Sequence, residues 1–193
     1  LPGNQVVRFG GADRYSTSRL ISDDAFPSAS VAYIATGLNF PDALSAAAAA
    51  GVRDAPVILV NGAAGSIDQP TRDLLVGMGV TTVYIAGGTS VVSPGIQSAI
   101  DALSGVSVVR LAEADRFSTS VAINANAFPT AGSAYLATAY GFADALAGAA
   151  LAGCNGGPLF VVQPGCVAAQ TLSQLTTMGT TSVTLFGGTA VLS

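Results

Sequence analysis

Apolar residues recur along this chain in short runs, separated by longer segments in which apolar and polar residues mix. Short apolar runs bounded by turn residues are typical of strands buried in a parallel sheet, and the longer mixed segments are typical of helices. The runs predict strands at residues 5–9, 31–36, 56–60, 81–86, 106–111, 133–138, 158–162 and 182–186. The segments between them predict helices at residues 14–25, 41–51, 68–78, 94–103, 116–127, 143–153 and 167–178. Because strands and helices alternate, we predict an α/β fold with parallel sheets and right-handed crossovers.

The same pattern of residues occurs twice. Residues 33–44 return as residues 135–146, and the Asp-Arg-aromatic-Ser-Thr-Ser segment at 13–18 returns at 115–120. Arg8 corresponds to Arg110 and, after a short deletion, the Gly-Gly-Thr segment at 87–89 corresponds to that at 187–189. Self-similarity at a fixed period is stronger evidence than any single local pattern. We therefore predict two tandem, pseudo-symmetric three-layer units with parallel sheets, residues 1–103 and residues 104–193.

Composition excludes several classes of function. Half of the 193 residues are apolar and 9% are charged, so the chain can bury a sizeable core. It contains no His, Lys or Trp, and Glu113 is its single Glu. This excludes a Ser-His-Asp triad, a Cys-His pair, a Ser-Lys dyad and His-ligated zinc, and neither a P-loop nor a Gly-x-Gly-x-x-Gly motif occurs. We expect no catalytic residues, cofactor or metal, no membrane span, and, at a net charge of −4, no nucleic-acid partner.

Two cysteines, Cys154 and Cys166, lie in the second copy. A disulfide between them is one interpretation, and two unreactive thiols are the other. The predicted strand at 158–162 separates them by ~13 Å at ~3.3 Å per residue, whereas bridged Cα atoms lie within ~7 Å. A bridge therefore requires loops that double back.

Polar residues follow several of the predicted strands. Ligands of open parallel sheets gather outside the carboxyl ends of the strands, where helix N-termini favour anions. Arginine offers a forked donor for an anion, and Asp and Asn can bond sugar hydroxyls. The candidate ligand-binding residues at this edge are Asp13, Arg14, Asn39, Asp42, Asp115, Arg116 and Asp144.

These candidates also have structural interpretations. Asp13 and Asp115 stand where helix N-caps are expected, and Asp42 and Asp144 stand where an acid complements the helix dipole. An enzymatic alternative is a pair of carboxylates for glycoside hydrolysis, with Asp13 and Asp42 facing each other across the sheet edge.

The order Arg-x-x-x-x-Asp-Arg-Tyr/Phe-Ser-Thr-Ser, Tyr-x-Ala-Thr-x-x-x-Phe-x-Asp-Ala-Leu and Gly-Gly-Thr-x-Val-x-Ser resembles the type 2 cell wall binding repeat. The resemblance covers almost the whole chain, twice. It implies a Rossmann-like α/β fold without a nucleotide site, in a secreted or surface protein of a Gram-positive bacterium. The implied function is noncovalent anchoring to an anionic cell-wall glycopolymer, without catalysis. The alternatives are a structural scaffold that assembles surface chains, and an Asp-dependent carbohydrate-active enzyme.

Arrays of this family commonly hold three repeats about a threefold axis, whereas this chain shows two. An apolar face left without a neighbour would favour a homo-oligomer, or packing with a further repeat. The two copies also differ, because Ala112-Glu113 replaces Gly10-Gly11, Ala143 replaces Pro41 and Gly141 replaces Asn39. We therefore expect unequal binding by the two copies. An anionic polymer would need Arg14 and Arg116, hydrogen bonds to sugars, or a bridging cation.

Overall fold

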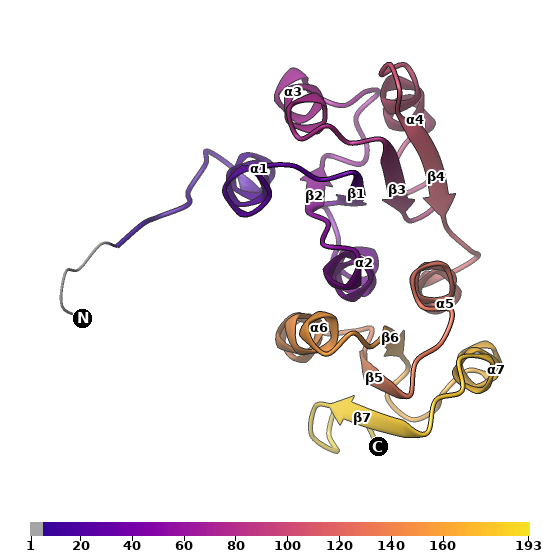
Figure 1. The fold of residues 1–193 in the computed structure, drawn as a ribbon. Helices are drawn as coiled ribbons and strands as arrows, with labels where there is room; N and C mark the ends of the chain where they lie inside the picture. The colour runs from indigo at the N-terminus through magenta and orange to yellow at the C-terminus, as the bar shows by residue number, and fades with distance from the viewer. Residues whose placement is uncertain (1–5) are drawn as a thin grey trace.

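The computed structural model describes residues 6–193, which form alternating helices and strands (Figure 1). The helices are α1 (Arg14–Ala25), α2 (Pro41–Val52), α3 (Gln69–Gly77), α4 (Pro94–Asp101), α5 (Arg116–Ala127), α6 (Ala143–Cys154) and α7 (Ala169–Thr177). The strands are β1 (Val31–Thr36), β2 (Val57–Val60), β3 (Thr82–Ala86), β4 (Ser107–Leu111), β5 (Ser133–Thr138), β6 (Leu159–Val162) and β7 (Ser182–Phe186). The predicted elements are present, with one exception near the N-terminus. Residues 6–9 form no strand, so that prediction is wrong, and Gln5 lies outside the described residues.

Two parallel sheets confirm the α/β prediction. The first has the strand order β2-β1-β3-β4 and the second has the order β6-β5-β7. The central strands β1 and β5 are almost wholly buried, which is why their sequences are continuously apolar or small. Helices α3 and α4 cover one face of the first sheet, and α2 lies on the other face, towards the second repeat (Figure 1).

The fourth strand of the first sheet is supplied by the second repeat. β4 pairs in parallel with β3, from Thr82 opposite Ser107 to Ala86 opposite Leu111. Arg110 on β4 donates from Nη1 to the carbonyl oxygens of Gly87 at 2.8 Å and Val92 at 2.9 Å. Its Nε donates to Gln97 Oε1 on α4 at 3.0 Å. The boundary between residues 103 and 104 stays a prediction, since a strand beyond it completes the sheet before it.

Helix contacts join the two repeats. The Ala-rich helix α2 packs against α5 and α6, and residues of both repeats share one apolar cluster that includes Tyr33, Ala46, Ile123 and Phe160. The backbones of α2 and α6 approach closely, because a Cβ built on Gly51 would lie 3.0 Å from the Cα atom of Gly153. Small residues in both helices therefore allow the repeats to pack as one body.

Two remaining predictions concern the cysteines and the membrane. Within residues 6–193 the structure holds Cys154 and Cys166 as free, exposed thiols rather than as a disulfide. In that same part of the chain, no helix combines the length and apolar character that crossing a bilayer requires.

Candidate functional site

Asp13 and Asp115 cap the helices α1 and α5. Asp13 Oδ1 accepts hydrogen bonds from the Ser16 backbone N–H at 2.7 Å and from Ser16 Oγ at 2.8 Å. Asp115 Oδ1 accepts the same two bonds from Ser118, each at 2.8 Å. In each pair the serine Oγ also accepts from the backbone N–H of the aspartate, which completes a capping box. These bonds to Ser16 and Ser118 lower the pKa of both carboxyls, so both caps are ionised at neutral pH.

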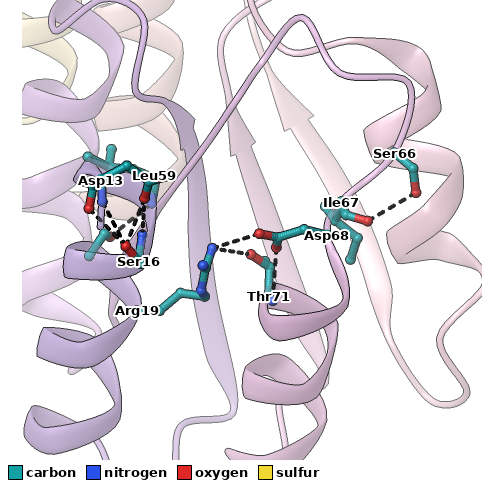
Figure 2. Close-up of polar contacts among 9 residues, drawn as sticks. Asp13, Ser16, Arg19, Leu59, Ser66, Ile67, Asp68 and Thr71 are labelled. Carbon is teal, nitrogen blue, oxygen red and sulfur yellow. Dashed lines mark hydrogen bonds and ion pairs between the residues drawn. The ribbon is translucent and has the colours of Figure 1, made fainter. Parts of the chain in front are cut away.

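A second polar cluster fixes α1 against α3 (Figure 2). Arg19 Nη1 donates to Asp68 Oδ2 at 2.9 Å and to Thr71 Oγ1 at 3.3 Å. Asp68 itself caps α3 by accepting from the Thr71 N–H at 3.0 Å. This cluster positions the helix whose first turn carries the Asp13 cap, and it lies within the first repeat.

The two candidate arginines hold loops of their own repeats. Arg14 Nη1 donates to the Gly37 carbonyl at 2.6 Å, and Arg116 Nη1 donates to the Ala139 carbonyl at 3.0 Å. The Arg116 guanidinium also lies 5.8 Å from the centroid of the Tyr140 ring. Among the described residues, each guanidinium uses one nitrogen to bond protein, so the other donors of its fork can bond a ligand.

A pocket of about 160 Å³ lies where the two repeats meet. The first repeat contributes the end of β1, the first turn of α2 and the loop after β3, and the second contributes the loop from β4 into α5. The lining residues are Thr36, Asn39, Pro41, Asp42, Gly88, Ser90, Val91, Glu113, Ala114, Asp115, Arg116 and Thr119.

The shared strand explains why this pocket combines residues of both repeats. Because β4 runs parallel to β3 in the first sheet, its carboxyl end lies at the same edge as the ends of β1 and β3. The loop that follows β4 therefore lies at the same sheet edge as Asp42. This loop carries Glu113, Asp115 and Arg116. This is the edge at which parallel α/β sheets bind ligands.

Asp42 is the most buried carboxyl of the pocket. Burial raises its pKa, and the positive charge of Arg116 partly offsets that rise. Gly87 makes room for it, since its φ is 111° and a Cβ there would lie 2.6 Å from Asp42 Oδ2. The pocket thus presents one cation, three acids and several hydroxyl and amide groups, a set that suits hydrogen bonding to sugars and contact with one charged group.

The structure divides the predicted site residues into two groups. Asn39, Asp42, Asp115 and Arg116 line the junction pocket. Asp13 and Asp144 do not line it, and neither does Arg14, which lines a separate, open groove of about 730 Å³ together with Asn39 and apolar residues of α2 and α6. The sequence grouped these loops within each copy, whereas the pocket forms between copies. Ligand binding by any of these residues remains a prediction.

Some lining residues were not among the sequence candidates. Glu113, Ser90, Thr36 and Thr119 contribute carboxylate and hydroxyl groups to the pocket. The sequence did contain one indication that Glu113 differs from its surroundings, because it is the only Glu and it stands where the first copy has Gly11. Within residues 6–193, no group of three or more His, Cys, Asp or Glu side chains has an arrangement that could hold a metal ion.

Comparison with known proteins identifies the family. The cell wall binding domain 2 (CWB2) model matches residues 8–97 and 110–193. The chain is 33% identical over 193 residues to the N-acetylmuramoyl-L-alanine amidase LytC of Bacillus subtilis (strain 168), and covers 38% of that protein. Its fold superposes on Cwp6 from Clostridium difficile with a TM-score of 0.87 and 28% identity, over 95% of this chain and 29% of that one. It is also similar to Cwp8 from Clostridium difficile, with a TM-score of 0.84 and 24% identity, over 97% of this chain and 32% of that one, a likeness that shows the fold alone. The chain therefore belongs to the cell wall binding domain 2 family, as two tandem copies of a cell-wall-binding repeat.

Proposed function

We propose that this chain is a non-catalytic module that anchors a secreted protein, outside the cell, to an anionic secondary cell-wall polymer of a Gram-positive bacterium. The chain spans less than half the length of these relatives, since it matches 38% of the amidase and 29% of Cwp6. A part of that size, with the fold of a wall-binding family, suits the attachment of other domains to the wall.

The observation that carries the proposal is the pocket between the repeats. Arg116 supplies a cation that can meet an acidic group of the polymer, and Asn39 and Ser90 supply partners for sugar hydroxyls. At about 160 Å³ the pocket is smaller than the ~300–1,000 Å³ of pockets that enclose whole drug-sized ligands. It is suited to one unit or one charged group of a polymer that continues across the surface.

The charges around the pocket also set its selectivity. The carboxylates of Asp42, Glu113 and Asp115 line the pocket together with its one arginine, Arg116. A polymer with closely spaced negative charges would place some of those charges next to the carboxylates and would be repelled by them. A polymer with spaced charges and many hydroxyls can place one anionic group at Arg116 and bond the acids through hydroxyl donors. We therefore propose a glycopolymer with separated acidic groups as the ligand.

The test is co-sedimentation of the purified chain with cell walls, measured over a range of protein concentrations. The control is the same wall preparation after its secondary polymers have been removed, with the peptidoglycan left intact. Saturable binding to complete walls and loss of binding to stripped walls is the expected result. Folded protein that remains in the supernatant with complete walls would contradict the proposal and would favour a purely structural scaffold.

One observation favours a second candidate function. Burial raises the pKa of Asp42 while the cap hydrogen bonds to Ser118 lower that of Asp115, and both residues line the same pocket. Carboxyls whose pKa values are shifted apart can act as acid and base in glycoside hydrolysis. Release of reducing sugar from wall glycans that disappears in Asp42→Asn would support this hydrolase, and unchanged glycans after long incubation would exclude it.

A further inference from the structure

A small polar pocket lies inside the first repeat, between α1, the loop after β2 and the start of α3. Its volume is about 70 Å³, which is room for roughly five water molecules at ~10–15 Å³ each. All of its lining residues belong to the first repeat, so it is separate from the junction pocket. The polar side chains that line it are Tyr15, Arg19, Asn61, Ser66, Asp68 and Thr71.

The charges of this pocket cancel. Arg19 Nη1 lies 2.9 Å from Asp68 Oδ2, and the other lining residues are uncharged. Figure 2 shows Arg19 reaching from α1 to Asp68 and Thr71 at the start of α3, with Ser66 and Ile67 on the loop before them. A free anion would meet the Asp68 carboxylate and a free cation would meet the Arg19 guanidinium. The pocket therefore favours a neutral ligand.

Several polar groups of the pocket have bonding capacity left within residues 6–193. Arg19 bonds protein through Nη1 alone, which leaves its Nε and Nη2 donors for a ligand. Asn61 Oδ1 accepts from the Ala63 N–H at 3.3 Å, so the side-chain amide nitrogen keeps both of its donors. The Tyr15 hydroxyl can donate and accept, and Asp68 can accept. Such a set suits hydroxyl groups, because each hydroxyl of a ligand can also donate and accept.

The loop that forms one side of the pocket is held in place by the rest of the first repeat. The Ser93 N–H donates to the Gly62 carbonyl at 2.9 Å, and Ser93 Oγ donates to the Ala64 carbonyl. Gly62 lies so close to the loop after β3 that a Cβ there would overlap the Val91 carbonyl oxygen. The pocket is therefore largely preformed, which reduces the entropy that a ligand loses by ordering it.

The second copy has lost the polar set at the corresponding position. Three of its residues are apolar replacements, namely Phe117 for Tyr15, Val121 for Arg19 and Ala168 for Asp68. The space there measures only about 10 Å³. Thr71 accepts from Arg19 at 3.3 Å, whereas the buried hydroxyl oxygen of its counterpart Thr171 has no hydrogen-bond partner among residues 6–193. The polar pocket is therefore a property of the first copy and does not follow from the repeat fold.

We propose that the pocket in the first repeat binds a neutral polyol group, of about the size of glycerol, as found in the hydroxylated side groups of carbohydrates. Arg19, Asn61 and Tyr15 bond its hydroxyls. Apolar groups on the remaining wall cover its carbon atoms, and these belong to Val60, Ala64 and Ile67. The second copy has no such site, so the two copies bind unequally.

The polyol pocket lies at the same sheet edge as the junction pocket. Thr36 at the end of β1 lines the junction pocket, and it stands opposite Val60, which lines the polyol pocket. A glycopolymer seated at Arg116 can extend along this edge and place a neutral group in the first repeat. Occupation of both pockets raises affinity, because the second contact is intramolecular. This use of the pocket rests on the proposed function, whereas polyol binding itself does not.

Titration of the ¹⁵N-labelled chain with glycerol, followed through its backbone amide resonances, tests the proposal. The resonances of residues 61–68 should shift and saturate. Those of residues 163–168 in the second copy should not, which provides an internal control. Propan-1-ol has the same number of carbon atoms but one hydroxyl, so it should cause no saturable shift at residues 61–68.

Two conservative variants remove hydrogen-bonding groups from the pocket. Tyr15→Phe deletes one hydroxyl, and Asn61→Asp keeps an acceptor oxygen but replaces the amide donors by a negative charge. Each should weaken glycerol binding by roughly two- to tenfold. Tyr84→Phe is the matched control, since the Tyr84 ring lies 4.4 Å from the Arg53 guanidinium and outside the pocket. Circular dichroism and melting temperatures verify that all three variants are folded.

Three results would overturn the polyol site and leave a pocket that holds water only: shifts at residues 61–68 that never saturate, equal shifts at residues 163–168, or glycerol binding that neither Tyr15→Phe nor Asn61→Asp weakens. Wall binding that persists alongside any of these would leave the proposed function intact. Saturable glycerol binding without wall binding would do the reverse. The two proposals therefore fail separately.

Discussion

Ser45 on α2 donates a hydrogen bond to Ser120 on α5 over 2.9 Å, and both hydroxyls are buried. Ser120 Oγ also accepts from the Val161 N–H on β6 at 3.1 Å. One hydroxyl therefore joins a helix of the first repeat to a helix and a strand of the second. The repeats are therefore joined by polar contacts as well as by apolar packing.

Replacement of Ser120 by Ala should destabilise the chain by about 1–3 kcal/mol, because it leaves buried partners unsatisfied. The matched control is Ser18→Ala, since Ser18 bonds Val57 and Leu59 within the first repeat and has no partner across the junction. Urea unfolding measures both. Equal losses of stability would show that the contact across the junction adds nothing.

Arg110→Ala should destabilise the chain by about 2–3 kcal/mol, because two loop carbonyls and Gln97 lose a charged donor. Arg8→Ala is the control at the corresponding position, where the side chain is exposed. Thermal unfolding at dilute concentration should show a lower midpoint for Arg110→Ala and an unchanged midpoint for Arg8→Ala. Similar midpoints for the two variants would mean that Arg110 does not fasten β4 to the first sheet.

Gly87→Ala should cost about 1–3 kcal/mol of stability, because the φ of 111° is strained for any residue with a Cβ. The added Cβ would also lie 2.6 Å from Asp42 Oδ2 and would displace that carboxyl. Gly88→Ala is the adjacent control, since a Cβ there meets no atom within 4 Å. Chemical denaturation distinguishes the two, and a Gly88→Ala variant as unstable as Gly87→Ala would contradict this account of the turn.

Asp42→Asn should raise stability at neutral pH. Burial raises the pKa of Asp42 in the folded protein above its unfolded value, so ionisation above the folded pKa weakens folding. As pH falls through the folded pKa, the wild-type carboxyl takes up a proton and the penalty is lost. The advantage of the variant should therefore shrink in that range and become constant below the unfolded value of about 3.9.

Melting temperatures across this pH range measure the effect, with Asp24→Asn on the exposed surface of α1 as the control. The control should show little pH dependence relative to the wild type. An Asp42→Asn advantage that persists unchanged into acid would mean that the buried charge is not its cause.

Local patterns predicted most of the fold. Val31–Thr36 and Ser133–Thr138 form strands as expected, because a short apolar run between turn residues is typical of a strand buried in a parallel sheet. The copied motifs also predicted that Asp13 and Asp115 would begin helices. Residues 6–9 carry the same strand pattern as residues 108–111 but pair with no strand among residues 6–193, because strand formation depends on a partner strand as well as on the local pattern.

The composition of the pocket was harder to predict. Asn39, Asp42, Asp115 and Arg116 were candidates because they follow strands, but their assembly depends on which sheet receives β4. Sequence order suggests that Ser107–Leu111 begins the second unit, whereas hydrogen bonding places it in the first sheet. Because β4 pairs with β3, Arg116 lines the same pocket as Asp42, whereas Arg14 lines a separate groove.

The most direct test of the account is the affinity of single-charge variants for complete cell walls. Asp42→Asn and Arg116→Gln, one from each repeat, should each weaken wall binding by about tenfold or more. Asp24→Asn and Arg72→Gln change the same charges away from the pocket and should bind as the wild type does. The double variant Asp42→Asn with Arg116→Gln should lose less than the product of the single losses, because both residues serve one site. Wall binding that survives both single changes in folded protein would contradict a binding site shared between the repeats.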